Sequence, residues 1–447
     1  MSSLSLVIIV VALLIVAASP GMADRPKLSA ADRAKLELIQ AQAESDLTGD
    51  ILPFWTRDTL DPEYGGFLTV VDRYGRPTAN TDKYVVMQAR MVWTLSAAWD
   101  HGIHSDRYKS FAAEGVKFIT QKMWDPQYGG YYMSVHRDGT PDDTRKEVYA
   151  QEFVLYGLSE YARVFHDASA LEWANRTWKL IQDKSADPEY GGFREDFDQQ
   201  WNPIPQSLGV GGVPSGKTLN VHMHMMEALT AYYRADPTPE NKKSLETVVD
   251  LIRAKSLTDQ GYALEPFDRK WTPIPDGQGR LSTYYGHDVE LAWLMRDAYV
   301  ALGRDPRTIE PQLYSLIDNA LTNGFDWDQG GLASMGPRGG KVFDDPNYKS
   351  DLRQKEWWEQ AELLVALSTA YRYTQKRIYL DALEKEWDWV WNHQIDHTAG
   401  DWFTETDFTT GAPLVLDKGL GGWKVCYHDG RALMQLSNQL KAILAAD

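Results

Sequence analysis

The chain has 447 residues and a net charge of −17 at pH 7, with 43% hydrophobic and 24% charged residues. This composition excludes intrinsic disorder and allows a sizeable core. The acidic balance argues against nucleic acid and phosphate-rich partners, whereas 12% aromatic residues suit neutral sugars, which stack on aromatic rings. The lone cysteine, Cys426, excludes an internal disulfide framework and any zinc or iron–sulfur site built on cysteines.

The N-terminus begins with an apolar run of fifteen residues at 4–18. A Ser-Pro pair ends the run, and small residues precede a cleavage point after Ala23. The run is shorter than the ~20 residues that a membrane-spanning helix needs. The sequence therefore predicts a secretory signal peptide at 1–23 and one catalytic domain at 24–447, secreted or periplasmic and free of the membrane after cleavage. An uncleaved anchor is the alternative, because no Lys or Arg precedes the run.

The rest of the chain repeats a short motif, written DPEYGGF in its first copy. The copies begin at Asp61, Asp125, Asp187, Asp259, Asp328 and Asp396, and the last three are weaker. The steps between them are 64, 62, 72, 69 and 68 residues, which indicates six near-equal structural units. The glycine pair is typical of a tight turn with positive φ, and Asp-Pro is typical of its start.

Each unit contains two segments whose apolar residues recur at three- and four-residue steps, the period of an amphipathic helix. The predicted pairs are 84–100 with 107–123, 148–166 with 168–183, 219–234 with 239–255, 286–303 with 308–322, and 357–373 with 377–393. The last helix, 428–445, is expected to pair with a helix around 28–51 and so to close a ring. Short β-like stretches are expected only at the glycine turns, as at 66–71. The pattern predicts an all-α fold, an (α/α)6 barrel with six inner and six outer helices, rather than an open solenoid.

Equivalent positions of the six units converge on the centre of such a barrel. About 24–37 residues after each glycine turn, the sequence has side chains that titrate, hydrogen-bond or stack: Arg90, Tyr149, His224, His287, Trp358 and His428. Aliphatic residues would be expected there if these positions were only core. Glu290 and Trp293 follow His287 on one helical face, and Asn220 lies one turn before His224.

Two imidazoles that face each other suit reversible removal of a proton from carbon, and Arg90 would stabilise the oxyanion that forms. A glycosidase would instead need two carboxylates flanking the bond. The sequence has no His-x-x-x-His pair and no Gly-rich phosphate loop, so no metal and no nucleotide cofactor is expected. A glycoside hydrolase and a non-catalytic carbohydrate-binding protein remain open at this point.

Four motifs in order carry a family resemblance. They are TLNVHMHMMEA at 218–228, YGHDVELAWL at 285–294, EWWEQAE at 356–362 and WKVCYHDGR at 423–431. They resemble the N-acylglucosamine 2-epimerase superfamily, and within it the cellobiose 2-epimerases, over essentially all of residues 30–445. The resemblance implies an (α/α)6 barrel that inverts C2 of a reducing-end sugar, without a redox cofactor, through a ring-opened enediolate.

The resemblance also implies roles for residues. His287 and His428 match the acid/base histidines, Arg90 matches an arginine near the reacting oxygens, and Glu290 is placed with this catalytic set. The predicted substrate-binding residues are Tyr149, Asn220, His224, Trp293, Trp358, Glu362 and Trp423. The implied substrate is a small neutral β-1,4-linked disaccharide, and the protein is expected to be a monomer or weak oligomer. A monosaccharide aldose–ketose isomerase and an N-acylglucosamine 2-epimerase are alternatives on the same fold.

Overall fold

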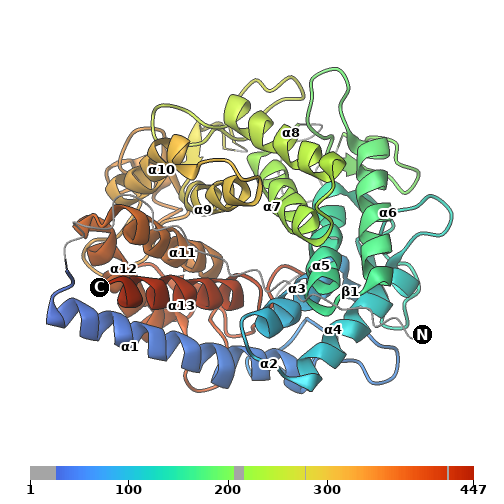
Figure 1. Cartoon of the computed structure of the whole chain (residues 1–447), viewed down its shortest axis with the longest axis horizontal. Coiled ribbons are helices and arrows are strands. Elements are labelled where there is room, and N and C mark those ends of the chain that lie inside the picture. Colours follow the sequence, from blue (N-terminus) through green and yellow to red (C-terminus); the bar gives the residue numbers. More distant parts are fainter. Residues whose placement is uncertain (1–26, 206–215, 277, 420–421) are drawn as a thin grey trace, which may run out of the picture.

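The computed structural model describes residues 27–205, 216–276, 278–419 and 422–447, and the predicted signal peptide lies outside these ranges. The long helices form two concentric rings (Figure 1). The inner ring consists of α3 (Val85–Asp100), α5 (Val148–Phe165), α7 (Leu219–Ala235), α9 (Tyr285–Ala301), α11 (Trp357–Thr374) and α13 (His428–Ala446). The outer ring consists of α1 (Ala30–Asp46), α4 (Asp106–Phe118), α6 (Ala168–Ser185), α8 (Pro239–Lys255), α10 (Glu310–Asn323) and α12 (Arg377–Trp389).

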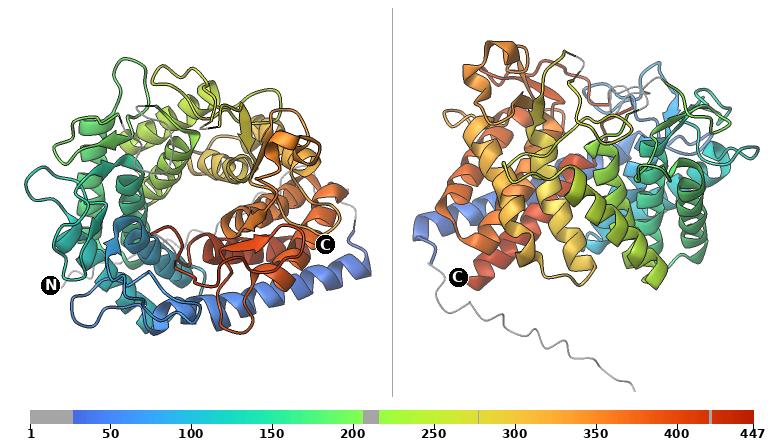
Figure 2. Two further views of the ribbon diagram at one scale, coloured as in Figure 1. Left: turned by 180° about the vertical axis from the view of Figure 1, so that it is seen from behind. Right: turned by 90° about the horizontal axis from the view of Figure 1, so that it is seen from above.

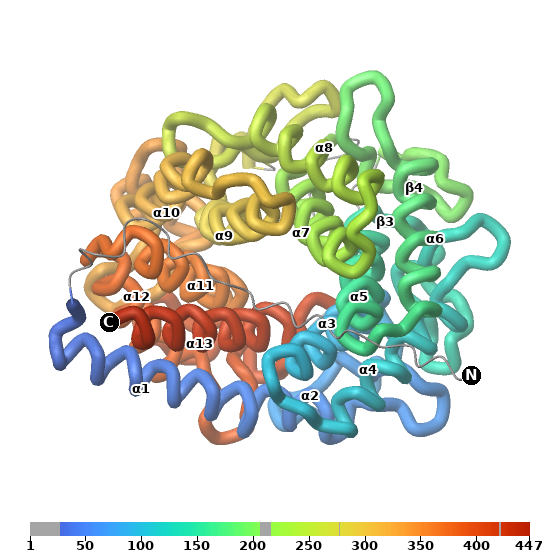
Figure 3. The backbone as a smooth tube through the Cα atoms, in the orientation of Figure 1, coloured from blue at the N-terminus to red at the C-terminus, as the bar shows by residue number. Residues whose placement is uncertain are grey.

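The ring is closed by the two ends of the described chain. Each inner helix packs against the next one and against its own outer partner, and α13 returns to α3. The outer partner of α13 is α1, which lies beside it in Figure 3. Arg33 of α1 forms an ion pair with Asp447 at 2.5 Å. The predicted (α/α)6 barrel is confirmed, and so is its closure by the N-terminal helix, which continues as a π-helical turn (Leu47–Ile51) and α2 (Leu52–Arg57).

The two rings differ in how their surfaces are buried. In α3 every residue from Val85 to Ala98 is buried, because inner helices are covered on all sides. The outer helix α4 buries one stripe, formed by Ala112, Gly115 and Phe118. Polar residues on inner helices therefore face either a partner or the barrel axis. Within the described ranges, none of these helices is long and apolar enough to cross a membrane.

The glycine turns have the predicted conformation. Gly65 and Gly66 have φ values of 74° and 68°, and an antiparallel bridge joins Leu60 to Phe67 across the turn. A similar bridge spans each of the six turns. A Cβ atom on Gly66 would lie 2.6 Å from the ring of Phe118, so the position requires glycine for space as well as for conformation.

Two turns begin earlier than the sequence pattern suggests. The fifth opens at Asp326, whose N–H bonds the carbonyl of Gly331, and not at Asp328. The fourth opens at Thr258, whose hydroxyl accepts the N–H of Gln260 at 3.2 Å, and not at Asp259. Neither turn contains the Asp-Pro pair that marks the first three. With only the glycines as a guide, the sequence pattern placed the start of both turns too late.

A buried ion pair that the sequence analysis did not predict ties four of the turns to the inner ring. In the first unit, Lys83 Nζ lies 2.9 Å from Asp61 Oδ2, and both side chains are fully buried. The lysine precedes its inner helix by two residues, and the equivalent pairs are Lys146–Asp125, Lys217–Asp187 and Lys355–Asp326. Removing one partner of a buried pair typically costs about 3–5 kcal/mol, so these pairs fix where the inner helices begin.

Four two-stranded antiparallel sheets lie where inner helices begin. They are β1 (Lys83–Tyr84) with β2 (Ser134–Val135), β3 (Lys146–Glu147) with β4 (Asp196–Phe197), β5 (Ser282–Tyr284) with β6 (Met335–Pro337), and β7 (Gln354–Glu356) with β8 (Glu405–Asp407). Figure 2 shows the strands and longer loops gathered at one end of the ring. The prediction of β structure only at the glycine turns is wrong, because two- and three-residue strands are too short to show alternation.

Candidate active site

A cavity of about 430 Å³ opens at the end of the barrel where the inner helices begin. Every inner helix contributes a side chain to its wall, because the six units place equivalent positions on the barrel axis. Nine of the eleven predicted site residues line it: Arg90, Tyr149, Asn220, His224, His287, Glu290, Trp358, Trp423 and His428. Glu356, Trp357, Thr404, Glu405 and Lys424 complete the lining. The structure thus brings together residues that are up to 338 positions apart in the sequence, from Arg90 to His428.

The other two predicted residues, Trp293 and Glu362, lie behind this wall. Trp293 Nε1 donates to Glu362 Oε2 at 2.9 Å, and Glu362 Oε1 lies 2.7 Å from His428 Nδ1. Trp293 lines a second cavity, of about 350 Å³, at the opposite end of the inner helices. Through these contacts both residues support His428, and their role in substrate binding stays a prediction.

The three histidines of the cavity share one arrangement. In each ring Nδ1 lies within hydrogen-bonding distance of a glutamate, so Nε2 is left for the cavity. The pairs are His224 with Glu227 at 2.9 Å, His287 with Glu265 at 2.5 Å, and His428 with Glu362 at 2.7 Å. A carboxylate that accepts the Nδ1 proton fixes the tautomer and leaves the Nε2 lone pair available as a base.

Trp358 contacts both His287 and His428. Its ring centroid is 5.3 Å from that of His287 and 5.8 Å from that of His428. Its Nε1 donates to Glu356 Oε2 at 2.9 Å, which holds the indole plane in place. A sugar ring stacked on this indole would therefore lie close to both imidazoles.

His287 and His428 differ in their electrostatic surroundings. Burial alone would lower the pKa of His287, but the carboxylate of Glu265 raises that pKa above its ordinary value. Burial lowers the pKa of His428 well below the ordinary value, and the nearby guanidinium groups of Arg90 and Arg431 lower it further. The two pKa values are therefore shifted in opposite directions, and His287 holds its proton to a higher pH than His428 does.

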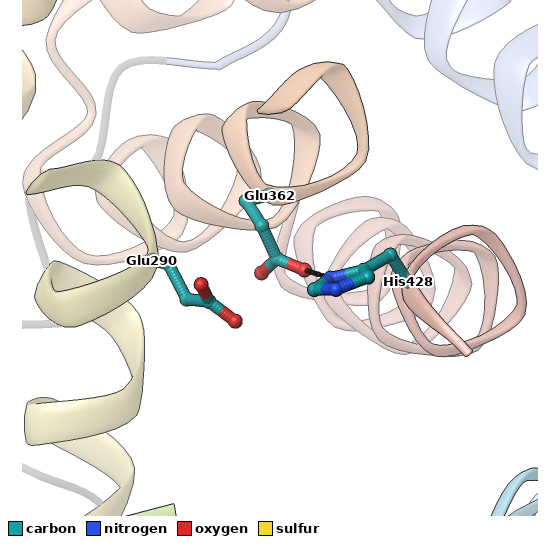
Figure 4. A group of neighbouring side chains, drawn as sticks. All are labelled: Glu290, Glu362 and His428. Atoms are coloured by element: carbon teal, nitrogen blue, oxygen red, sulfur yellow. Dashed lines mark hydrogen bonds and ion pairs between the residues drawn. The ribbon is translucent and has the colours of Figure 1, made fainter. Parts of the chain in front are cut away.

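Glu290, Glu362 and His428 form a compact group of possible ligands (Figure 4). One ligand atom from each lies within 4.8 Å of the others, a spacing that a metal ion could bridge. In this structure the positive charge comes from Arg431, which donates to Glu290 Oε1 at 2.7 Å and to Glu362 Oε1 at 2.6 Å. Both carboxyl groups thus already accept hydrogen bonds from a guanidinium, and Glu362 is also bonded to the imidazole of His428.

Glu290 presents its second oxygen to the cavity. Oε2 is buried and has no hydrogen-bond partner among the described residues, and it lies 4.0 Å from His224 Nε2. Burial, together with the charge of Glu362, raises the pKa of Glu290 to about 8. The carboxyl is therefore able to donate a proton to an oxygen of a bound ligand near neutral pH.

Arg90 is held at the cavity edge by its own hydrogen bonds. Its guanidinium donates to the carbonyl of Trp423 at 2.6 Å and to the hydroxyl of Tyr149 at 2.8 Å. It also stacks 4.4 Å above the ring of Phe153. Because the group is 3% exposed, its positive charge acts in a medium of low dielectric constant, where it stabilises a nearby oxyanion strongly.

Two residues that contact the site, Arg431 and Glu265, were assigned no role by the sequence analysis. Arg431 was part of a quoted motif, but its contacts with three other helices are visible only in the fold. Glu265 lies two residues after Ala263, the bridged residue that ends the fourth turn. The same repeat position is occupied by Glu195 and Thr404, both polar, so an inspection of this second repeat position would have found Glu265.

Comparisons with known proteins agree with this geometry. The cellobiose 2-epimerase of Bacteroides fragilis is 31% identical over 413 residues, which cover 90% of this chain and 99% of that protein. The solved structure of cellobiose 2-epimerase from Spirochaeta thermophila superposes with a TM-score of 0.82 at 29% identity, covering 93% of this chain and all of that one. The D-mannose isomerase of Marinomonas mediterranea is 24% identical, over 80% of this chain and 87% of that protein. Residues 65–432 match the N-acylglucosamine 2-epimerase (GlcNAc 2-epimerase) family, and the chain belongs to that family.

Proposed function

We propose that this protein is a carbohydrate 2-epimerase that acts on the reducing-end glucose of a β-1,4-linked disaccharide such as cellobiose, and yields the mannose-ended epimer. The observation that carries the proposal is the pair of cavity histidines, His287 and His428, which both contact the indole of Trp358 and each have Nδ1 against a glutamate. The similarity to cellobiose 2-epimerases along nine-tenths of the chain supports the substrate class.

The proton transfers follow from the charges of the two rings. After the sugar ring has opened, Nε2 of the neutral His428 removes the C2 proton, and the C2–H electron pair forms an enediolate with C1 and its oxygen. Rotation about the C2–C3 bond then presents the other face of C2. Nε2 of the protonated His287 delivers a proton to that face, which restores the aldehyde with C2 inverted. Solvent returns the two histidines to their initial charges.

The negative charge of the enediolate is stabilised by groups already in place. Arg90 supplies a buried positive charge, and Glu290, protonated near neutral pH, supplies a hydrogen-bond donor at Oε2. The cavity also lies at the N-terminal ends of the inner helices, where the helix dipoles favour negative charge. The inner-ring architecture thus contributes to the same electrostatic task as the individual side chains.

The alternatives differ in the product that they form. An aldose–ketose isomerase would form the same enediolate but return the proton to C1, giving a ketose. A glycoside hydrolase would need two carboxylates flanking the glycosidic bond. Of the three glutamates that line the cavity, Glu290 is bonded to Arg431, whereas Glu356 and Glu405 are directly opposite each other on β7 and β8. They therefore approach a ligand from one sheet, and not from two sides.

A product profile tests the proposal. The purified protein is incubated separately with cellobiose, mannobiose, lactose, glucose and mannose, and products are separated by anion-exchange chromatography. We expect the C2 epimer of the disaccharides with no new reducing ends. A ketose as the main product would indicate the isomerase, new reducing ends the hydrolase, and binding without product a carbohydrate-binding protein.

We also propose that the protein is exported and acts as a monomer or weak oligomer. The apolar run at 4–18 and the small residues before the cleavage point support export. N-terminal sequencing of protein recovered outside the cytoplasm tests this, with Asp24 expected as the first residue. A retained run in a membrane fraction would instead show an anchor. Sedimentation across a concentration series tests the oligomeric state.

A further inference from the structure

Arg431 lies at the centre of the buried polar network beneath the active site. It is on α13, three residues after His428, and is 1% exposed. Its guanidinium donates to Glu290 Oε1 at 2.7 Å and to Glu362 Oε1 at 2.6 Å, and it also bonds Glu227. These glutamates come from α7, α9 and α11, so one side chain links four of the six inner helices.

Two of these glutamates orient histidines of the cavity. Glu227 lies 2.9 Å from His224 Nδ1, and Glu362 lies 2.7 Å from His428 Nδ1. The third His–Glu pair differs, because Glu265 lies outside this network and Arg431 does not contact it. The arginine therefore contacts the carboxyl partners of His224 and His428, but not the partner of His287.

A carboxyl group next to Nδ1 can fix either tautomer, depending on its own charge. An ionised carboxylate accepts the Nδ1 proton, so Nε2 is left as a base toward the cavity. A protonated carboxyl donates to Nδ1 instead, and the ring proton then lies on Nε2. Three buried carboxyl groups so close together cannot all remain ionised without a cation. Glu362 therefore depends on Arg431 for the state that makes His428 a base.

We propose that Arg431 is a positioning residue: by clamping Glu227 and Glu362 in their ionised state, it fixes the ring orientation and the Nδ1–H tautomer of His224 and His428. This rests on the proposed function for its catalytic consequence, but not for the tautomer itself. For Glu227 the electrostatics agree. Burial would raise the pKa of Glu227, yet Arg431 and then His224 lower it to about 2. Burial raises the pKa of Glu362, and Arg431 is the strongest opposing influence.

The test compares Arg431→Gln and Arg431→Lys with a matched control, Arg234→Gln. Arg234 is also on the inner ring, pairs with Asp297 at 2.7 Å, and lines the cavity at the opposite end of the barrel. Histidine is labelled with ¹⁵N in the full-length protein, and the ring nitrogen shifts are read without substrate. We expect the wild type and the control to show His428 as the Nδ1–H tautomer. Arg431→Gln is expected to show the Nε2–H tautomer.

The pH profile of kcat/KM gives the second readout. The charged and titratable groups that face His428 are Glu362, Arg90, His224, Glu227, Glu290 and Arg431. Loss of the guanidinium raises the pKa of both Glu362 and His428, so the acid limb moves to higher pH. We expect a fall in kcat of at least about 10-fold. Arg431→Lys keeps the positive charge but cannot bond several carboxyl groups in the planar geometry of a guanidinium. We expect its acid limb to stay at the wild-type pH and its kcat to be lower.

Each outcome decides a stated point. An unchanged tautomer and an unshifted acid limb in a folded Arg431→Gln would overturn the proposal, even if activity fell. If Arg431→Gln does not fold, Arg431→Lys is measured in the same way: its tautomer must match the wild type while kcat falls, and full activity would contradict the clamp. Failure of the proposed function is distinguishable, because the wild type would then lack epimer formation while the tautomers still responded to Arg431.

Discussion

His287 and His428 are built alike but lie in opposite electrostatic surroundings. Each ring has Nδ1 against a glutamate and lines the same cavity beside Trp358. Glu265, the partner of His287, has no contact with Arg431, whereas Glu362, the partner of His428, accepts a hydrogen bond from Arg431. We therefore propose that the same local motif serves as a proton donor in one place and as a proton acceptor in the other. Inversion of a carbon requires that combination.

The largest effects are expected from the rings themselves. His287→Ala and His428→Ala should each lower kcat/KM by about 10²–10⁴-fold, the usual contribution of a general acid or base. His136, an exposed histidine just after β2, serves as the control, and His136→Ala should keep wild-type activity. A near-normal rate in either cavity variant would remove that histidine from the mechanism.

The pH profile should separate the two glutamate partners. Activity needs neutral His428 and protonated His287. Activity should therefore fall at low pH, where His428 gains a proton at a pKa below 6.5. It should also fall at high pH, where His287 loses its proton at a pKa above 6.5. Glu265→Gln removes the charge that raises the pKa of His287, so the basic limb should move to lower pH, with a loss of roughly 10-fold or more above neutrality.

Glu362→Gln should act differently, because it removes the negative charge beside Nδ1 of His428 and so weakens that ring as a base. We expect a lower plateau with the basic limb in its wild-type position. Equal shifts of the basic limb in both variants, measured as kcat/KM from pH 5 to 9, would contradict the asymmetry between the two pairs.

Smaller effects are expected from the tryptophans. Trp358 contacts both histidines, whereas Trp423 is 38% exposed at the cavity edge. Each indole should contribute about 1 kcal/mol to sugar binding. Trp358→Ala should lower kcat as well as raise KM, because it also orients the sugar between the two bases, and Trp423→Ala should mainly raise KM. Loss of cooperative thermal unfolding in either variant would point to core packing instead.

No effect is expected from removal of divalent metals. A metal ion bound by Glu290, Glu362 and His428 would compete with Arg431 for the same oxygens and would occupy the base. Activity should therefore survive exhaustive dialysis against EDTA without added cofactor. Loss of activity that a divalent ion alone restores would show that the His428 pair works through a metal.

Much of the fold followed from the sequence, because the signals were local and repeated. The glycine turns and the helical period recur six times, and together they predict the barrel and its closure. The buried pair of Lys83 and Asp61 was not predicted, because its partners are 22 residues apart and neither residue type is expected in a core. The fourth turn was misplaced because Thr258 stands where the first three turns have aspartate.

The candidate site was predictable only near the starts of the inner helices. Arg90, His287 and His428 all lie within the first two turns of an inner helix, and the structure places all of them in the cavity wall. Glu265 was missed because it occupies a different repeat position, on a loop. Arg431 was seen in a motif, but its role depends on contacts with Glu227, 204 residues away, that no local pattern encodes.

Turnover in D₂O tests the central claim most directly. If His428 removes the C2 proton and His287 returns one from the other side, the hydrogen at C2 of the epimer comes from a group that exchanges with solvent. Mass spectrometry and NMR of the product from cellobiose should show one deuterium, at C2, in nearly every epimer molecule after a single turnover. An epimer formed at the normal rate with the original hydrogen still at C2 would contradict the two-histidine account.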